Sequence, residues 1–441
     1  TEYTMLGRNL EAVEAAREAL SLLGIEVPSD DVRSALEREI WPIMAALENR
    51  PIASLIDLPE MSDPVFRTAM KVLMPVHTAA YFAGQRDLYG WFLAKMTNLS
   101  LVHGHVPESS KGYASLGGVL CAEFSEFQDG YEFAKLAIRL AERYHDNGLK
   151  CRACLIMVSF VSHWARHVSD AEQYLDVGIQ SGMEAGEHQF VSYLLMWGKI
   201  INRFHAGTPL AQLLATADES LAFTRKVKNL LATDSVLAGR AVFANLNGRT
   251  AHDEDFDLDE LSEADFVAGC AEHNSHSSLA FYYTLRAFAL YLHGHLEAAR
   301  ESIEKALSLG KFIASYFTEA DLNYIHSLIL LALDDAAGLH AANPTVARNQ
   351  QQLKLWAKSC PENFWHKVDL VEAEQARIEN RVGDAIAAYD RAIAQAASSR
   401  FVQDEALANE LAGRFWCRRG KAEFASLHLQ RGYRGYQRWG A

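Results

Sequence analysis

Hydrophobic residues recur along most of the chain at spacings of three and four, the period of one face of an α-helix. The window from Asp63 to Gly84 shows the pattern clearly, with an Asp–Pro pair that suits a helix N-terminus and a glycine at its end. Similar windows of about 15–20 residues follow one another, separated by glycines, to the end of the chain. Alternating strand patterns bounded by turns are essentially missing. The sequence therefore predicts an all-α protein of about 18–20 helices.

A longer regularity is superimposed on the helical period. A small residue, a large apolar residue four positions later and a small residue three positions after that recur as a set. The sets are Ala12/Ala16/Ala19, Ala134/Ile138/Ala141, Ala171/Leu175/Gly178, Ala299/Ile303/Ala306, Ala385/Tyr389/Ala392 and Ala425/Leu429/Gly432. Such positions share one helix face, and small residues there let an antiparallel neighbour approach closely. The pattern resembles the second helix of a tetratricopeptide repeat (TPR) and predicts a TPR-like α-solenoid, a superhelix of antiparallel helix pairs.

One acidic segment, residues 251–265 (AHDEDFDLDELSEAD), interrupts the helical pattern. Its carboxylates include Asp253, Glu254, Asp255, Asp257, Asp259 and Glu260. The segment lacks the central glycine and the terminal glutamate of an EF-hand loop, so a solvated loop or insertion is favoured over a weak divalent-cation site. We expect this segment to separate an N-terminal helical-repeat block, residues 1–250, from a C-terminal block, residues 266–441.

Composition narrows the classes of function. The 441 residues carry 42 basic and 56 acidic side chains, and the net charge of −14 disfavours nucleic acid as a partner. No signal peptide opens the sequence, and no apolar run is long enough to insert into a membrane. Six cysteines are too few for a disulfide scaffold. These features predict a cytoplasmic protein with reduced thiols.

Motifs that would carry chemistry are incomplete. The Gly–Lys pairs at 198–199, 310–311 and 420–421 lack both the following Ser or Thr and the upstream glycine of a phosphate-binding loop. Cys151 and Cys154 have CxxC spacing but no second pair for zinc, so buried structural thiols are favoured. His163 and His167 could face one metal ion, but two ligands are too few, and core or surface histidines are favoured. We therefore assign no catalytic residue, cofactor or metal site.

Two segments are candidates for partner binding. Tyr89, Trp91, Lys95 and Asn98 could line a concave groove, although aromatic residues at helical spacing more often belong to the core. The C-terminal segment Arg414–Ala441 has seven basic residues and one acidic residue. Its candidate binding residues are Arg431, Arg434, Tyr436 and Arg438. This segment is either a capping helix with a solvated outer face or a docking surface for a neighbouring domain.

Two stretches carry more than a generic repeat signal. They are Leu55–Leu120, with LPEMSDP and KMTNLSLVHG, and Asp404–Ala441, with ALANELAGRF and GYQRWGA. From Leu6 onward, the chain resembles the helical-repeat region of large bacterial multi-domain signalling proteins. In that family, a Ser/Thr-kinase-like domain and an AAA-type ATPase precede the repeats, and GAF or PAS sensors with a histidine kinase or cyclase output follow. The resemblance implies that this chain is part of a longer protein, and it brings no catalytic residues.

The first functional hypothesis is a non-catalytic regulatory scaffold within a multi-domain signal-transduction kinase or ATPase. The resemblance implies that such a scaffold couples an upstream ATPase to downstream sensor and output domains. Its partner would be another protein or neighbouring domains of the same chain, because stacked helix pairs create an extended surface for recognition. The alternative is a small-molecule-sensing helical-repeat domain that controls an attached ATPase or transcription activator. That alternative requires an enclosed pocket with converging polar groups.

Overall fold

The fold is described from a computed structural model of the 441-residue chain. The structure describes residues 8–48, 50–258, 260–339 and 343–441. The start of the family resemblance at Leu6 and the acidic residue Asp259 lie outside these ranges. Within them the regular secondary structure is helical, without β-strands, and the β-type pairing consists of two isolated bridges. When segments joined without a break are counted as one, the described residues contain twenty α-helical rods, which confirms the all-α prediction.

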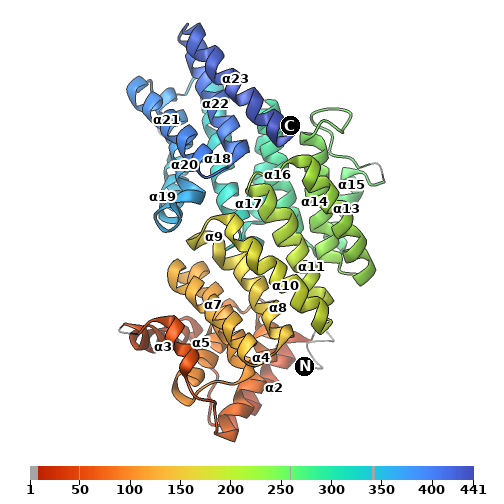
Figure 1. The fold of residues 1–441 in the computed structure, drawn as a ribbon, viewed down its shortest axis with the longest axis vertical. Helices are drawn as coiled ribbons and strands as arrows, with labels where there is room; N and C mark the ends of the chain where they lie inside the picture. Colours follow the sequence, from red (N-terminus) through yellow and green to blue (C-terminus); the bar gives the residue numbers. More distant parts are fainter. Residues whose placement is uncertain (1–7, 49, 259, 340–342) are drawn as a thin grey trace. The chain divides into compact units, whose positions relative to one another are not determined.

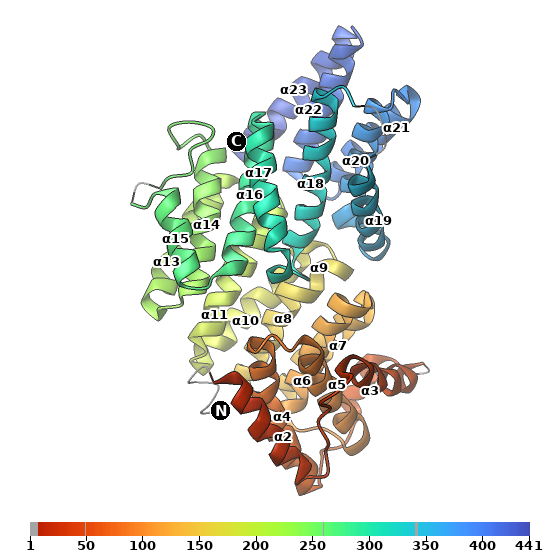
Figure 2. The ribbon, with the colours of Figure 1, turned by 180° about the vertical axis from the view of Figure 1, so that it is seen from behind.

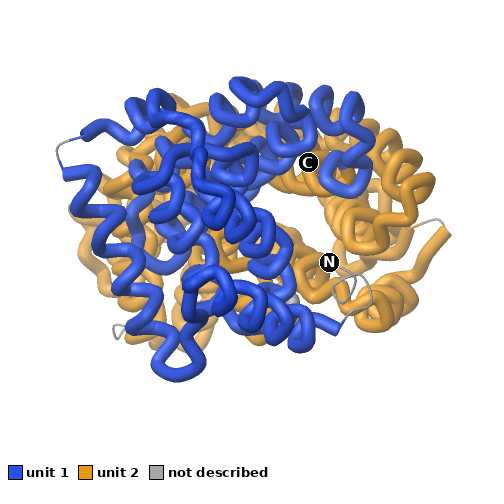
Figure 3. Tube along the Cα trace, turned by 90° about the horizontal axis from the view of Figure 1, so that it is seen from below, with its two compact units in different colours: residues 1–161, 173–191 blue, residues 162–172, 192–441 orange. Residues whose placement is uncertain are grey.

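The chain forms two compact units. Unit 1 comprises residues 1–161 and 173–191, and unit 2 comprises residues 162–172 and 192–441 (Figure 3). The acidic segment 251–265 lies inside unit 2, so these units differ from the expected blocks 1–250 and 266–441. Residues 251–258 of that segment are irregular, as expected for a loop, whereas α15 (Glu263–Glu272) begins inside it. The Ser262 hydroxyl accepts a hydrogen bond from the Asp265 N–H and caps that helix.

The first helix predicted from the hydrophobic pattern shows how local sequence places a helix boundary. Helix α4 spans Pro64–Phe82, close to the predicted window. The Asp63 carboxylate accepts a hydrogen bond of 2.8 Å from the Val65 N–H, and Pro64 occupies the first helical position. Gly84 follows the helix with a φ of +74°, a conformation that glycine adopts without steric cost.

Unit 1 consists of helices that pack mainly on their neighbours in the sequence. Helix α4 contacts α5, and α6 contacts α7 and α8. The unit contains α2 (Asn9–Ser21), α3 (Val32–Leu47), η1 (Ile52–Asp57), α4, α5 (Arg86–His103), α6 (Pro107–Val119), η2 (Leu120–Phe124), α7 (Phe127–Arg143), α8 (Asn147–Ile156), η3 (Met157–Val161), most of α10 (Glu172–Ala185) and the start of α11 (His188–Leu194).

Unit 2 begins with shorter segments and continues as a regular stack (Figure 1). Its remaining elements are α9 (Ser162–Ala165), η4 (Val168–Ala171), η5 (Leu195–Asn202), α12 (Arg203–His205), α13 (Leu210–Val227), α14 (Leu230–Leu246), α16 (His276–His293), α17 (Leu296–Ser308), η6 (Gly310–Phe312), α18 (Phe317–Ala336), α19 (Pro344–Ser359), α20 (Pro361–Ile378), α21 (Val382–Ser398), α22 (Val402–Arg418) and α23 (Ala422–Trp439).

The stack in unit 2 consists of four successive helix pairs: α16 with α17, α18 with α19, α20 with α21, and α22 with α23. The first helices also contact one another from pair to pair, α16 with α18, α18 with α20 and α20 with α22, so they form one layer (Figure 1 and Figure 2). Each of α17, α19 and α21 also packs on the first helix of the next pair. This arrangement of antiparallel pairs is that of a TPR-like α-solenoid and confirms the predicted fold class.

The small–large–small sets mark second helices of these pairs. In α17 and α21 all three positions of the set are buried. The large middle residue is buried at Ile138, Leu175, Ile303 and Tyr389. It is 37% exposed at Leu429 in α23, the last helix of the stack. The repeat signal in the sequence therefore reports the packing face of the second helices.

Glycines allow a close helix crossing in unit 1. A Cβ atom added at Gly117 in α6 would lie 2.5 Å from the Gly130 carbonyl oxygen of α7, whereas one added at Gly118 would find its nearest atom at 3.8 Å. We expect Gly117→Ala to lower the free energy of unfolding by about 1–3 kcal/mol, because two backbones must separate. Urea denaturation followed by circular dichroism measures this change.

The matched control for this prediction is the adjacent Gly118→Ala. This substitution should leave the free energy of unfolding unchanged or raise it by about 0.5–1 kcal/mol, because alanine is the better helix former. Equal effects of the two substitutions would contradict the assigned crossing.

Candidate functional site

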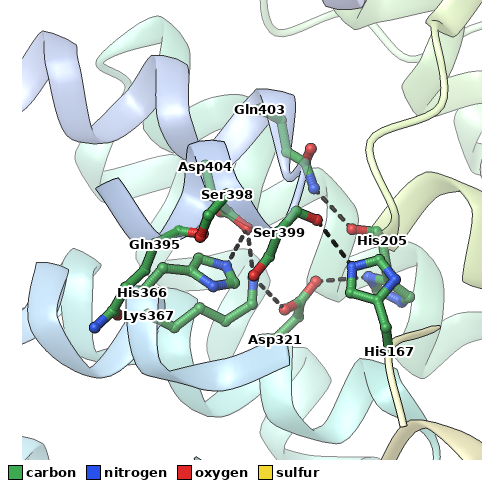
Figure 4. Close-up of polar contacts among 10 residues, drawn as sticks. All are labelled: His167, His205, Asp321, His366, Lys367, Gln395, Ser398, Ser399, Gln403 and Asp404. Atoms are coloured by element: carbon green, nitrogen blue, oxygen red, sulfur yellow. Dashed lines mark hydrogen bonds and ion pairs between the residues drawn. The ribbon is translucent and has the colours of Figure 1, made fainter. Parts of the chain in front are cut away.

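The interior of unit 2 holds a cluster of five ionisable side chains, which we call the buried ionic network. Its members are His205, Asp321, His366, Lys367 and Asp404 (Figure 4). They come from α12, α18, α20 and α22, and all are buried. Charges are placed in protein interiors only where partners compensate for their lost hydration.

Lys367 is the centre of the buried ionic network. Its Nζ atom lies 3.0 Å from Asp321 Oδ1 and 2.8 Å from Asp404 Oδ2. Each carboxylate also contacts a histidine, because His205 Nδ1 lies 2.6 Å from Asp321 Oδ2 and His366 Nε2 lies 2.9 Å from Asp404 Oδ2. The Lys367 ammonium thus joins the two Asp–His pairs into one chain of contacts (Figure 4). This chain connects α12 with the three first helices α18, α20 and α22.

The contacts in the network determine which groups are charged. Burial alone would raise the pKa of Asp404, but the Lys367 ammonium and the His366 ring outweigh burial and hold this pKa below its ordinary value. Burial likewise opposes charge on Lys367, but Asp321 and Asp404 raise its pKa above the usual value. For His366 burial prevails, and its pKa is lowered. The network therefore contains an ionised lysine between two ionised carboxylates.

The contacts around the buried ionic network indicate that its role is structural. The Gln403 side-chain amide donates a hydrogen bond of 2.8 Å to the His205 carbonyl oxygen, and the His167 Nε2 atom lies 2.9 Å from the Ser399 carbonyl oxygen. The Lys367 ammonium also lies 4.6 Å from the centre of the Tyr324 ring. Because its charges are buried and satisfy one another, the network holds helices together and presents no reactive group to solvent.

A groove of about 470 Å³ lies near the opposite ends of the same first helices; we call it the first-helix groove. It is lined by Tyr291, Gly294, Leu296, Ala332, Asp335, Ala336, Glu374, Arg377, Leu411, Arg414, Phe415 and Arg418. The residues from α22 follow the spacing i, i+3, i+4, i+7, so they occupy one helix face. The volume is within the range of ligand-binding clefts, roughly 300–1,000 Å³.

Ion pairs line the first-helix groove. Asp335 accepts contacts from Arg377 at 3.1 Å and from Arg418 at 2.7 Å, while Arg377 also lies 2.8 Å from Glu374. Burial would raise the pKa of Asp335, but the two guanidinium groups outweigh burial and lower it. The side chain of Arg414 lies 2.5 Å from Glu410. The side chains of Arg414 and Arg418 are 56% and 59% exposed.

The first set of predicted binding residues lies on α5 in unit 1. Trp91 is buried, and Tyr89 is half-buried. The Lys95 ammonium lies 2.5 Å from a Glu39 carboxylate oxygen, and the Asn98 amide donates hydrogen bonds to the Glu39 carbonyl and carboxylate oxygens at 2.9 and 2.7 Å. Lys95 and Asn98 thus attach α5 to α3.

The second set lies on α23 in unit 2. Arg431 and Arg434 are exposed, and Arg438 is exposed with an ion pair of 3.2 Å to Glu405. The Tyr436 hydroxyl donates a hydrogen bond of 2.7 Å to Glu410 on α22. The three arginines therefore lie on the solvent side of α23, whereas Tyr436 joins this helix to its pair.

The remaining candidate motifs of the sequence are internal. Cys151 and Cys154 are buried, and burial raises the pKa of each thiol to about 12, so both are protonated. His163 is buried between the Trp164 and Phe317 rings, and His167 lies beyond the end of α9. In the described ranges, no group of three or more His, Cys, Asp or Glu side chains is arranged to hold a metal ion. None of the described helices combines the length and apolar character of a bilayer span.

Sequence reasoning missed both the buried ionic network and the first-helix groove. One signal was available for the network: Lys367 lies three residues after Phe364 and four before Val371, so it belongs to the apolar face of its helix. A charged residue inside an apolar stripe indicates a buried partner. The groove has no comparable signal, because its lining residues come from helices far apart in the sequence.

We expect Lys367→Met to lower the free energy of unfolding by about 3–5 kcal/mol, because two buried carboxylates lose their shared cation. The double substitution Lys367→Met with Asp404→Asn should recover part of this loss. Urea denaturation of the three proteins measures both effects. The half-buried Lys354, whose side chain is 43% exposed and pairs with Glu372 at 2.6 Å, is the control, and Lys354→Met should cost less than about 1 kcal/mol. A similar cost for both lysines would contradict the assigned role.

The free energy of unfolding should also fall as the pH is lowered below about 6.5, which is the ordinary pKa of histidine. Burial lowers the pKa of His163 to about 3, so the unfolded chain binds this proton before the folded chain does. The contribution of His163 is fully present above the unfolded pKa and is lost as the pH falls towards 3. Between pH 7.5 and 4.5 the loss should be about 2.5 kcal/mol for this residue.

The variant His163→Phe should reduce that loss, as measured by urea denaturation at both pH values. The exposed His252 is the control, and His252→Gln should leave the pH dependence unchanged. The same pH dependence in wild type and His163→Phe would show that this histidine does not contribute.

No protein-family model matches the chain. The chain is similar to hybrid signal transduction histidine kinase G of Dictyostelium discoideum, with 20% identity over 249 residues that cover 52% of this chain and 7% of that protein. Among solved structures it is similar to a Rap protein complexed with competence and sporulation factor, with a TM-score of 0.42, 10% identity and coverage of 93% of this chain and 99% of that chain. A circular tandem repeat protein aligns with a TM-score of 0.15, 11% identity and coverage of 98% and 96%.

Proposed function

We propose that this chain is a non-catalytic protein-interaction module that regulates the signalling domains attached to it. The observation that carries the proposal is the first-helix groove. Successive first helices of the stack each contribute one face to this groove. A repeat stack presents such faces side by side, and an extended segment of a partner can contact several of them at once. The partner is another protein or a neighbouring domain of the same polypeptide.

The chemistry of the groove supports recognition. Arg414 and Arg418 lie on one face of α22 and are more than half exposed, whereas Leu411 and Phe415 on the same face are buried. The apolar lining that reaches solvent comes from Leu296, Ala332 and Ala336. Charged rims around apolar surface favour selective association, because each wrong partner leaves a charge without compensation. The groove thus offers both apolar area and exchangeable ion pairs.

The domains attached to this module are part of the same proposal. The stretches Leu55–Leu120 and Asp404–Ala441 resemble a region that stands between an ATPase and sensor or output domains in bacterial signalling proteins. We infer that the stack couples such domains, so that a partner in the groove changes the output of an attached kinase or ATPase. The titratable groups described above support a non-catalytic role, since the buried network and the thiols are closed to substrates.

The alternative is a sensor of small molecules that controls an attached ATPase or transcription activator. One observation favours it: the groove volume of about 470 Å³ would also accept a compact organic ligand. A small ligand would fill the groove alone, whereas a polypeptide would continue beyond it along the layer of first helices.

A photo-crosslinking amino acid at Ala336, an exposed residue of the groove, distinguishes these functions. In the intact parent protein in its own cells, we expect crosslinks to a polypeptide segment, either of the same chain or of another protein. The double variant Arg414→Glu with Arg418→Glu should reduce the yield to that of a control crosslinker at the exposed residue Ala215 on α13.

Absence of a polypeptide crosslink would contradict the first proposal. Thermal-shift screening of the chain against metabolites then tests the alternative, which requires a shift that Ala336→Trp abolishes. ATP hydrolysis or phosphotransfer by the purified chain alone would contradict both.

A further inference from the structure

Lys111 in unit 1 is a lysine without a counter-ion. It lies on α6, is half-buried, and makes no hydrogen bond or ion pair with any residue that the structure describes. Every other lysine that is not exposed has a carboxylate oxygen within 4.0 Å of its ammonium nitrogen. These lysines are Lys95, Lys135, Lys150, Lys199, Lys354 and Lys367. Because a half-buried ammonium has lost part of its hydration, the missing partner of Lys111 requires an explanation.

A second cation, Arg152 of α8, lies beside Lys111. Helix α6 packs directly on α8, and a Cβ atom added at Gly118 of α6 would lie 3.8 Å from Ile156 of α8. Gly118 is two turns after Lys111, and Ile156 is one turn after Arg152, on the same helix faces. The faces that bear the two cations therefore meet. Burial, and then the charge of Arg152, lower the pKa of the Lys111 amine to about 8.

Arg152 is only partly compensated. Its Nη2 atom lies 2.7 Å from Glu187 Oε1, and its guanidinium lies 4.6 Å from the centre of the Phe190 ring. Its Nε atom is buried and has no hydrogen-bond partner among the described residues. Lys111 and Arg152 thus share one carboxylate contact and retain one ammonium and one N–H donor without an acceptor.

The helices around Lys111 supply no carboxylate to it. Neither α4 nor α8 contains an acidic residue, and both pack on α6. The acidic residue of α6 is Glu108, one turn before Lys111, and the two are not within ion-pair distance. The charge of Glu108 acts instead on the Tyr144 phenol. The excess positive charge at Lys111 is therefore a property of the whole α4–α6–α8 layer.

His77 of α4 is the remaining titratable group near the two cations. Burial most, and then the charge of Lys111, lower the pKa of its ring to about 3, so the ring is neutral. Its Nδ1 atom lies 3.4 Å from the Leu73 carbonyl oxygen, and its Nε2 atom lies 3.3 Å from the Thr78 hydroxyl. The ring is engaged with its own helix and carries no charge that could balance Lys111.

From these contacts we propose that Lys111 and Arg152 bind a small oxyanion, a ligand that carries a phosphate or carboxylate group. Its oxygens accept from the Lys111 ammonium and from the Arg152 Nε–H, the two donors that the described residues leave without an acceptor. The ligand then joins α6 to α8. The site lies in unit 1 and shares no residue with the first-helix groove of unit 2, so this inference does not depend on the proposed function.

The number and burial of the cations favour a small ligand. Nucleic acid and anionic membranes are bound by rows of exposed cations, whereas this site has two half-buried cations in a chain of net charge −14. One oxyanion group matches one ammonium and one N–H donor. The ligand class is therefore a compact molecule with a terminal phosphate or carboxylate.

Acetylation of the 441-residue chain by N-hydroxysuccinimidyl acetate, quantified for each lysine by mass spectrometry, tests the inference. The reaction requires an unprotonated amine, and a bound anion raises the pKa of Lys111 and covers its amine. Near pH 7.5, increasing inorganic phosphate at an ionic strength held constant with chloride should slow the acetylation of Lys111 by roughly fivefold or more. Acetate replaces phosphate in the carboxylate arm. The exposed Lys71 of α4 is the internal control and should change by less than about 1.5-fold.

Arg152→Gln tests the second cation. The ratio of acetylation rates with and without phosphate should move towards one, because the variant lacks one charge and the Nε–H donor. The matched control is Arg139→Gln, the same change at an exposed position of α7 in the same unit, which should keep the protection of Lys111. Circular dichroism verifies that each variant is folded.

Lys111→Met separates ligand binding from a structural role. An unpaired half-buried charge does not stabilise the fold, so this variant should leave the midpoint of urea denaturation unchanged or raise it. Phosphate raises the midpoint of folded proteins in general. It should raise the midpoint of the wild type further than that of Lys111→Met, because only the wild type binds the anion.

Several results would overturn the inference: acetylation of Lys111 that neither phosphate nor acetate slows, equal protection of Lys71, or equal protection in the Arg152 and Arg139 variants. A lowered midpoint in Lys111→Met would show that the lysine has a structural role. Protection by polyglutamate alone would assign the cations to an acidic polypeptide and refute the small ligand. None of these results affects crosslinking at Ala336, so the proposed function is tested separately.

Discussion

The buried ammonium of Lys367 is the contact on which the arrangement of unit 2 depends. A lysine without hydration must keep both carboxylates, Asp321 and Asp404, within contact distance, and these come from the helices on either side of its own. The three helices α18, α20 and α22 are thereby held in one axial register near their N-terminal ends. Apolar contacts alone would tolerate a shift of one helix along another, whereas a buried ion pair does not.

The same register brings the opposite ends of these helices together. Asp335, Arg377 and Arg418 lie near the C-terminal ends of α18, α20 and α22, where they form a second set of ion pairs in which only Arg418 is largely exposed. The two sets differ in what they can do. The buried set is satisfied internally and serves cohesion, while in our proposal a binding partner rearranges the second set. A repeat stack can thus separate the charges that hold it together from those that recognise a partner.

Local sequence was sufficient for much of the fold and for little of the site. Asp63 and Pro64 place the start of α4 through a cap and a preset backbone angle, both of which involve only adjacent residues. Lys95 and Asn98 were candidates for a groove, but both contact Glu39, which lies 56 and 59 residues earlier in the chain. Such a contact depends on how α3 and α5 pack, and helical periodicity does not contain that information.

The sequence by itself determined that this protein is a series of helix pairs and which face of several second helices is buried, because helical period, caps and small-residue sets act within a few residues. It also placed the three arginines of α23 on a common segment. Only the tertiary structure decided that Lys367 is buried between two carboxylates, that first helices share a groove, and that Arg431, Arg434 and Arg438 of α23 face solvent. These features arise where helices distant in the sequence meet, and the chemistry of a site in a repeat stack depends on those meetings.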